Sequence, residues 1–219
     1  MRKLILSIVL MLATLEVTAT EILVGRPTGE AKGMVVISPA KKYLMKERLF
    51  TELAKSLNAK GYITVRFNWS KSTLEVPELE LVRAAEDLNQ VVTEAQREFG
   101  FGADKTILIS KSFSTKALNP SMALAATHIL LTPNCSVEAP FEKTYGEILN
   151  NSNISLNILI SIEDPNCDVH QIHLALAGIA KLPTLLTTHG DHNFVVSQDG
   201  VLDYRFQDEV IRFVSGLVK

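Results

Sequence analysis

The chain has 219 residues and a formal net charge of −2 at pH 7, and 47% of its residues are hydrophobic. This size suits one domain with a sizeable core. Without a strongly basic field, nucleic acid is not an expected partner. No internal repeat, low-complexity tract or Pro/Gly/Ser-rich linker divides the sequence, so we expect a single domain.

The N-terminal residues 1–19 have the pattern of a secretory signal peptide. Arg2 and Lys3 give a basic start, residues 4–15 are almost wholly apolar, and residues 17–19 are small enough for a signal peptidase. The apolar run is shorter than the ~20 residues that a membrane-spanning helix needs. We therefore expect cleavage after Ala19, export to the periplasm or the medium, and no stable membrane insertion of the mature residues 20–219. An uncleaved anchor is the alternative.

Beyond this segment, apolar runs and helical periodicity alternate along the chain. An opening pair of strands is predicted at 21–25 and 33–38, around a turn-rich stretch. The later segments are predicted in the order helix 46–59, strand 62–67, helix 77–99, strands 106–109, 128–131 and 155–162, helix 169–180, strand 184–187 and helix 204–217. This alternation indicates βαβ units, and hence an α/β fold with a three-layer, doubly wound and mostly parallel sheet.

The only two cysteines, Cys135 and Cys167, each close a Pro-Asn-Cys tripeptide that follows an apolar run. Successive strands of this kind are neighbours in a sheet, with their C-terminal ends at one edge. In an exported protein this placement favours a disulfide over two buried thiols, which remain the alternative.

Three polar segments follow predicted strands, in the order serine, acid and histidine. They are residues 110–114 (SKSFS), 163–165 (EDP) and 190–194 (GDHNF). In a doubly wound sheet the functional site lies outside the C-terminal strand ends, where all three segments fall. A serine hydroxyl becomes a useful nucleophile only on an exposed turn beside an imidazole that takes its proton.

Residues 33–219 resemble a small α/β-hydrolase, close to the dienelactone hydrolase type and most similar to the compact KANL/Tex-like group. The shared features are Gly61-Tyr62 followed by Arg66-Phe67-Asn68, then Lys111-Ser112, Asp164-Pro165, and Asp191-His192 with Phe194. The order Ser, Asp, His is the one found in α/β-hydrolases. The resemblance implies an α/β-hydrolase fold. No sizeable cap fits between residues 132 and 155, so we expect an open, shallow site.

The expected chemistry assigns Ser112 as the nucleophile, His192 as general base and then acid, and Asp164 as the group that orients the imidazole. The backbone N–H groups of Phe113 and Ala40 are the expected oxyanion donors. The expected substrate is a small ester or related acyl compound, with no cofactor and no metal. Oligomeric state is not predicted.

The sequence departs from the family pattern at two places. Ser110 and Ser114 occupy the positions of the usual elbow glycines, and Ser38-Pro39-Ala40 replaces the usual His-Gly. Proline has no N–H, so the second oxyanion donor has to come from Ala40 or Lys41. These departures leave a second hypothesis open, in which the chain is an inactive, hydrolase-like binding protein.

Several candidate residues have competing interpretations. Glu163 competes with Asp164 for the role of the acid, and His189 competes with His192 for the role of the base. Asn68 and Trp69 follow a core strand and are candidates for a substrate-facing wall. Trp69 is equally consistent with an anchor for the loop that follows.

The N-terminal pattern predicts that the exported protein starts at Thr20. Mass spectrometry of protein recovered from the periplasm or the medium checks this directly. An Ala19→Leu variant, which removes the small residue before the cut, should remain uncleaved. Exported protein that retains Met1 would contradict the signal-peptide prediction.

Overall fold

The computed structural model describes residues 21–41, 44–70, 73–74, 79–135, 140–151, 153–177, 179 and 182–218. The predicted signal peptide, residues 1–19, lies outside the described residues, as does the predicted start of the long helix at residues 77–78.

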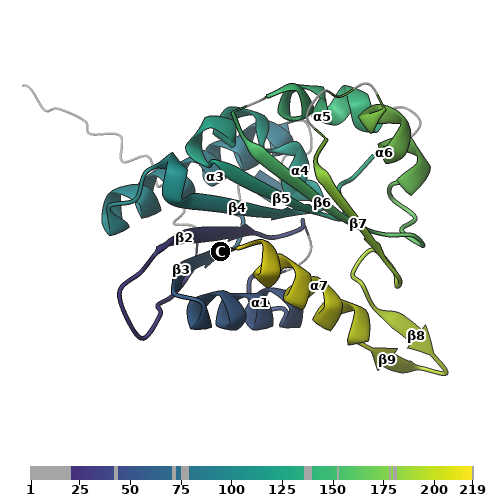
Figure 1. Cartoon of the computed structure of the whole chain (residues 1–219), viewed down its shortest axis with the longest axis horizontal. Coiled ribbons are helices and arrows are strands. Elements are labelled where there is room, and N and C mark those ends of the chain that lie inside the picture. Colours follow the sequence, from purple (N-terminus) through teal and green to yellow (C-terminus); the bar gives the residue numbers. More distant parts are fainter. Residues whose placement is uncertain are drawn as a thin grey trace, which may run out of the picture.

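A seven-stranded sheet forms the centre of the molecule, in the order β1-β3-β2-β4-β5-β6-β7. The strands are β1 Ile22–Gly25, β2 Gly33–Ser38, β3 Tyr62–Phe67, β4 Thr106–Lys111, β5 Thr127–Leu131, β6 Ser155–Ser161 and β7 Thr184–Thr188. Every neighbouring pair is parallel except β1 and β3. A small antiparallel pair, β8 Val196–Gln198 and β9 Val201–Asp203, projects from one end of the molecule (Figure 1).

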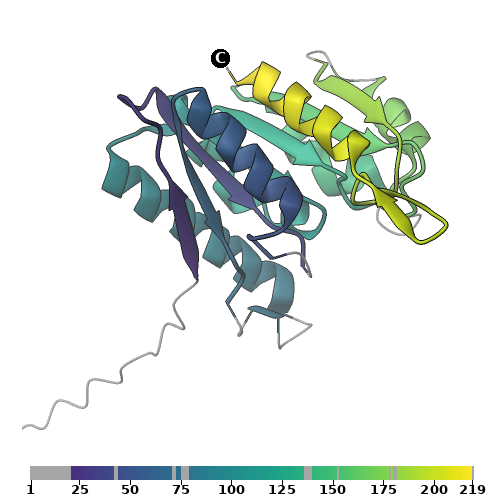
Figure 2. The same cartoon turned by 90° about the horizontal axis from the view of Figure 1, so that it is seen from below.

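Helices cover both faces of the sheet (Figures 1 and 2). The helices α1 Arg48–Ala59 and α7 Arg205–Leu217 lie on one face, and α3 Glu80–Phe99, α4 Phe113–Lys116, α5 Phe141–Asn150 and α6 Val169–Leu176 lie on the other. Short 3₁₀ turns occur at Ala103–Lys105 and Asn119–Leu124. The predicted three-layer, doubly wound architecture is confirmed.

The amphipathic pattern of the helices explains this layering. In α1 the buried residues are Leu49, Phe50, Leu53, Ala54 and Leu57, which recur with helical spacing on the face turned to the sheet. The central strands are apolar on both faces because helices cover both sides of a doubly wound sheet. In β2, for example, every residue is buried. Two hydrophobic clusters result, one on each side of the sheet.

The predicted opening pair of strands is wrong in its pairing. Both strands exist, but β1 pairs with β3, with Ile22 opposite Phe67. The reason is that β3 and β4 occupy both edges of β2, so the free edge of β3 is the place left for β1. β1 therefore forms one edge of the sheet, antiparallel to β3, and β3 lies between it and β2.

The other differences concern element ends and short elements. The strand predicted to end at Ile109 continues to Lys111, and the helix predicted to end at Ala180 stops at Leu176. The helix α5 and the β8–β9 pair were not predicted. Among the described residues, no helix combines the length and the apolar character required to cross a bilayer.

A disulfide joins Cys135 to Cys167, as predicted, with Cα atoms 4.7 Å apart. The two cysteines follow β5 and β6, which are parallel neighbours. The backbone N–H of Cys135 also donates to the carbonyl oxygen of Asn166 at 3.0 Å. The covalent bond therefore ties together two loops at the C-terminal edge of the sheet.

Removing this bridge should destabilise the protein. The loop that it closes spans 32 residues, for which the chain-entropy model gives about 3 to 4 kcal/mol of stabilisation. A Cys135→Ala/Cys167→Ala variant should unfold at a correspondingly lower urea concentration than the oxidised wild type. Wild-type protein kept reduced is the control and should match the variant. Equal midpoints for oxidised and reduced wild type would contradict the prediction.

Candidate active site

The candidate nucleophile, Ser112, stands on a sharp turn between β4 and α4. Its backbone has φ 53° and ψ −112°, a region that residues with a side chain rarely adopt. The Ser112 N–H donates to the carbonyl oxygen of Leu131 at 2.9 Å, and its own carbonyl accepts from the N–H of Thr115 at 3.0 Å. A strained strand-to-helix turn of this kind holds a serine hydroxyl clear of the sheet.

The two serines in place of the elbow glycines have different surroundings. The Ser114 hydroxyl, which has one hydrogen to donate, lies within hydrogen-bond distance of the carbonyl oxygens of Ser38, at 3.1 Å, and Lys111, at 3.0 Å. It thereby links the nucleophile turn to the end of β2. The Ser110 hydroxyl is buried and has no hydrogen-bond partner among the described residues. Ser114 therefore holds the turn by its hydroxyl, whereas Ser110 contributes only its small size.

The candidate base, His192, lies in a tight loop after β7. Gly190 has φ 100°, and a Cβ there would meet the backbone of Phe194 and Val195 at 2.8 Å. The Asp191 carboxylate accepts from the N–H groups of Asn193 and Val195, and Phe194 is fully buried. The loop is thus closed on itself and anchored in the core.

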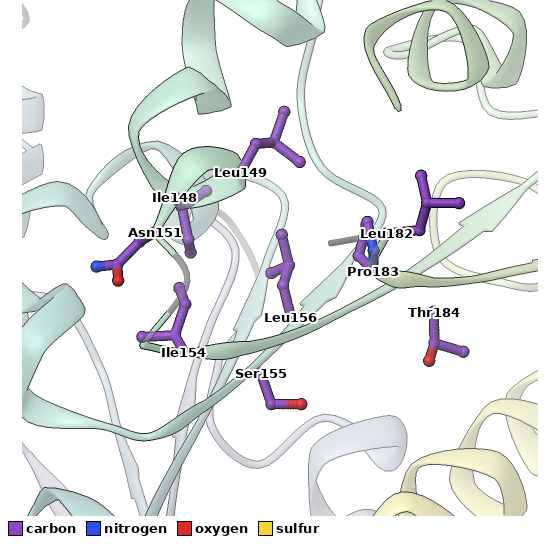
Figure 3. Close-up of a pocket in the computed structure, with 9 residues that line it drawn as sticks. All are labelled: Ile148, Leu149, Asn151, Ile154, Ser155, Leu156, Leu182, Pro183 and Thr184. Atoms are coloured by element: carbon purple, nitrogen blue, oxygen red, sulfur yellow. The ribbon is translucent and has the colours of Figure 1, made fainter. Parts of the chain in front are cut away.

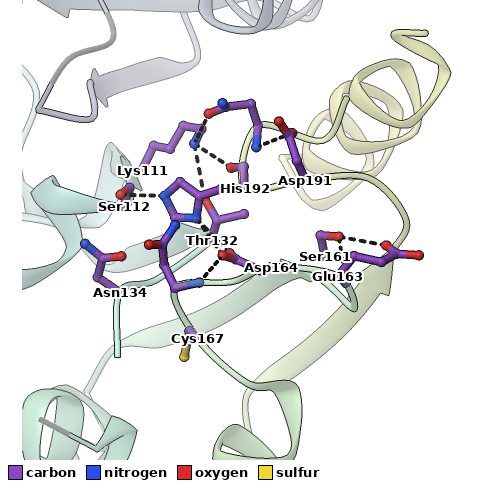
Figure 4. Close-up of polar contacts among 12 residues, drawn as sticks. Lys111, Ser112, Thr132, Asn134, Ser161, Glu163, Asp164, Cys167, Asp191 and His192 are labelled. Carbon is purple, nitrogen blue, oxygen red and sulfur yellow. Dashed lines mark hydrogen bonds and ion pairs between the residues drawn. The ribbon is translucent and has the colours of Figure 1, made fainter. Parts of the chain in front are cut away.

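Serine, histidine and acid come together in one hydrogen-bonded line (Figure 4). The Ser112 Oγ lies 2.6 Å from His192 Nε2, and His192 Nδ1 lies 2.8 Å from Asp164 Oδ2. A carboxylate only accepts hydrogen bonds, so Nδ1 carries the proton and Nε2 is free to accept from the serine hydroxyl. The Asp164 side chain is completely buried, whereas that of His192 is 17% exposed.

The loop that carries Asp164 is fixed by its neighbours. The Asp164 Oδ1 also accepts the N–H of Asn166 at 2.8 Å, and the disulfide follows one residue later at Cys167. A buried carboxylate with a neighbouring amide donor and an imidazole partner is held in one orientation. The disulfide therefore stabilises the segment that orients the imidazole.

The two expected oxyanion donors, Phe113 and Ala40, are linked through the side chain of Trp69. Phe113 is the first residue of α4, and the first N–H groups of a helix have no partner within it. Ala40 follows Pro39, whose carbonyl oxygen accepts from Trp69 Nε1 at 3.2 Å. The Trp69 ring also packs edge-on against Phe113, with centroids 5.6 Å apart. Trp69 thus connects the two backbone segments that are expected to bind the oxyanion.

The contacts of Asn68 and Trp69 are framework contacts. Asn68 Oδ1 accepts from the N–H of Met45, and its amide nitrogen donates to Glu21 Oε2. Trp69 is buried, with 7% exposed. The substrate-facing role suggested for these two residues stays a prediction, and the loop-anchor alternative for Trp69 agrees with its hydrogen bond to Pro39.

The competing acid and base pair with each other. Glu163 Oε1 lies 2.7 Å from His189 Nδ1, and both side chains are more than half exposed. The Glu163 Oε2 accepts the N–H of Gly190 at 2.9 Å. The hydrogen bond from His189 is the main reason that the pKa of Glu163 lies below its usual value. This pair joins the loop after β6, which carries Asp164, to the loop after β7, which carries His192. In the described residues, the Ser112 hydroxyl is hydrogen-bonded to His192.

Two further groups near the candidate triad had no role of their own assigned from the sequence. The first is a buried chain in which Thr115 Oγ1 contacts Tyr145 OH at 2.6 Å, and Tyr145 OH donates to the carbonyl oxygen of Asn134 at 3.0 Å. It joins α4 to the disulfide loop, and burial raises the pKa of Tyr145. The second is Lys111, which is wholly buried next to Ser112. A lysine at the end of an apolar strand was the available signal.

A small, partly open pocket of about 90 Å³ lies elsewhere, at the N-terminal ends of β6 and β7 (Figure 3). Its lining includes Ser155 and Thr184, the first residues of β6 and β7. The three candidate catalytic side chains follow the C-terminal ends of strands. This pocket therefore lies at the end of the sheet opposite to the candidate catalytic residues.

Comparisons with known proteins give the fold. No family model matches the chain, and no curated protein matches it. An α/β serine hydrolase homologue from Coxiella burnetii is 19% identical, with a TM-score of 0.72 over 91% of this chain and 92% of the other. An α/β serine hydrolase without a lid from Xanthomonas campestris is 16% identical, with a TM-score of 0.62 over 90% and 85%.

A third solved structure is Est1E from Butyrivibrio proteoclasticus with ferulic acid bound. It is 13% identical to this chain, with a TM-score of 0.68 over 91% of this chain and 94% of the other. The chain thus has the α/β-hydrolase fold. The narrower dienelactone hydrolase-like or KANL/Tex-like grouping stays a prediction.

The different surroundings of the elbow serines generate a matched pair of variants. Ser114→Ala should lower the free energy of unfolding by about 1 kcal/mol, because it removes a buried hydroxyl that is hydrogen-bonded to the backbone. Ser110→Ala should be neutral or slightly stabilising, since it removes a buried hydroxyl without a partner among the described residues. Urea unfolding of both variants checks this. Equal losses in the two would show that the serines play the same role.

Proposed function

We propose that the protein is a serine hydrolase that cleaves a small ester or related acyl substrate with Ser112, His192 and Asp164. The observation that carries the proposal is the continuous hydrogen-bonded line from Ser112 Oγ through the His192 ring to the buried Asp164 carboxylate. Similarity in fold to serine hydrolases supports it.

The proposed reaction is acyl transfer in two halves. Ser112 Oγ attacks the ester carbonyl carbon while its proton passes to His192 Nε2. The N–H groups of Phe113 and Ala40 stabilise the oxyanion that forms. Its collapse breaks the ester bond, and His192 returns the proton to the departing alcohol. Water then attacks the acyl-serine by the same route, which releases the acid and restores Ser112.

The surroundings of the serine favour small, soluble substrates. Between β5 and β6 the described part of the chain contributes only the ten-residue helix α5, which packs on one face of the sheet (Figure 1). One structural neighbour is likewise described as lacking a lid. A site without a large cap encloses little of a long acyl chain.

Export is part of the proposal. The signal-like residues 1–19 support it, and the Cys135–Cys167 disulfide is of the kind that persists in oxidising compartments. The protein would then act in the periplasm or outside the cell.

The triad proposal predicts hydrolysis of nitrophenyl acetate and labelling of Ser112 by a fluorophosphonate. Ser112→Ala and His192→Ala should each lower kcat/KM at least about a hundredfold, and their double variant should lose little more, because triad members act as a unit. Asp164→Asn should cost less than either.

Matched variants separate this proposal from its competitors. Glu163→Gln and His189→Ala change the neighbouring acid and base pair and should retain most of the activity. Full activity in Ser112→Ala, with loss in either of these two variants, would refute the assignment. A wild type with neither turnover nor labelling would instead favour the inactive binding protein.

A further inference from the structure

Lys111 is a charged side chain in an unusual place. It is the last residue of β4, it directly precedes Ser112, and its exposed fraction is 0%. Burial of an ammonium group is costly unless hydrogen-bond acceptors surround it. A hydrophobic side chain would suit this end of an apolar strand better, so the position calls for an explanation beyond packing.

The Lys111 ammonium reaches two loops that belong to the site (Figure 4). Its Nζ donates to the carbonyl oxygen of His192 at 2.8 Å and to Asn193 Oδ1 at 3.2 Å. It also donates to Thr132 Oγ1, directly after β5, at 3.2 Å. One side chain thus connects the strand of the nucleophile with the backbone of the base.

We propose that Lys111, as an ammonium ion, is a positioning residue that holds the base loop, residues 190–194, against the nucleophile turn. The inference rests on the proposed function for its effect on rate. Because Lys111 and Ser112 are adjacent in the chain, the bond from Nζ to the His192 carbonyl limits the separation of Ser112 Oγ and His192 Nε2. On its other side the loop is held by Gln207, whose amide nitrogen donates to the Asn193 carbonyl at 2.9 Å.

The protonation state of Lys111 determines how many hydrogen bonds its Nζ can donate to the base loop. An ammonium has three N–H donors and can donate to Thr132 Oγ1, the His192 carbonyl and Asn193 Oδ1, whereas a neutral amine has two donors and turns a lone pair toward an acceptor oxygen. Burial lowers the pKa of Lys111 from 10.5 to about 7, and the Asp164 and Asp191 carboxylates oppose that shift. The contact is therefore complete below about pH 7 and weakens as the pH rises through that value.

The other groups around Lys111 do not reverse the weakening of this contact with rising pH. His192 is the remaining titratable side chain of the base loop, and it must be neutral to act as a base. From α7, the uncharged Gln207 donates to the Asn193 carbonyl of this loop. Arg48 of α1 is directed to Gln207 and Asp208.

Lys60 provides a matched control. Its Nζ also donates to backbone carbonyl oxygens, those of Ser215 and Val218, but between α1 and the end of α7. Lys111→Met and Lys60→Met each remove one ammonium group that binds carbonyl oxygens. Only the first removes it beside the candidate triad.

The experiment measures hydrogen exchange of residues 188–196 and the hydrolysis of nitrophenyl acetate in full-length wild type, Lys111→Met and Lys60→Met. In Lys111→Met we expect exchange in this segment to rise about tenfold or more. The kcat should fall about tenfold to a hundredfold, as for a misplaced base, with KM changed by less than about twofold. Lys60→Met should leave both the segment and kcat unchanged.

The pH profile gives a readout that a purely structural role would not move. The wild-type rate should fall on the alkaline side as Lys111 loses its proton, and the residual rate of Lys111→Met should lack this fall. Should Lys111→Met not fold, Asn193→Ala keeps the test open: it removes one acceptor and should lower kcat and raise exchange in the same segment by smaller factors.

The outcomes separate this inference from the proposed function. Unchanged exchange and kcat in Lys111→Met would overturn the positioning role while leaving the hydrolase intact. A flat alkaline profile in the wild type would overturn the dependence of the contact on the Lys111 proton. An inactive, unlabelled wild type would overturn the hydrolase. In that case the exchange comparison still decides whether Lys111 holds the loop, because it requires no turnover.

Discussion

The parallel register of β4, β5, β6 and β7 is the constraint on which the candidate site depends. Ser112 and His192 are 80 positions apart in the chain, and Asp164 and His192 are 28 apart. They meet because each follows a strand, or a short loop after a strand, whose C-terminal end lies at the same edge of the sheet. A slip of one residue in β4 would turn the nucleophile segment to the opposite face.

Much of the fold could be predicted from the sequence because its signals are local. Short stretches of sequence are enough to recognise the apolar strands, the amphipathic α1 and the polar segments that follow strands. The disulfide followed from two similar tripeptides after neighbouring strands. The antiparallel partner of β1 could not be found in this way, because the choice depends on which sheet edges other strands have already occupied.

The same distinction between local and long-range information applies to the candidate site. The residues of the predicted triad were selected by order and position, and the structure brings their side chains together, although their catalytic roles stay predictions. Ser114, Tyr145 and Lys111 each donate to a backbone carbonyl group of another segment, that of Ser38, Asn134 and His192 respectively. A residue type alone does not reveal such a partner. For Asn68 the sequence indicated the strand end, but its two side-chain hydrogen bonds became visible only in the folded chain.

The backbone of Ser112 also has an evolutionary consequence. A residue with a side chain at φ 53° and ψ −112° carries strain of order 1 to 3 kcal/mol, which glycine would largely avoid. A lineage that no longer needed the hydroxyl would gain stability from a single change to glycine, so mutation and selection would tend to remove the serine. On the proposed function, the hydroxyl of Ser112 is the reason that a serine, and not a glycine, stands at this strained turn.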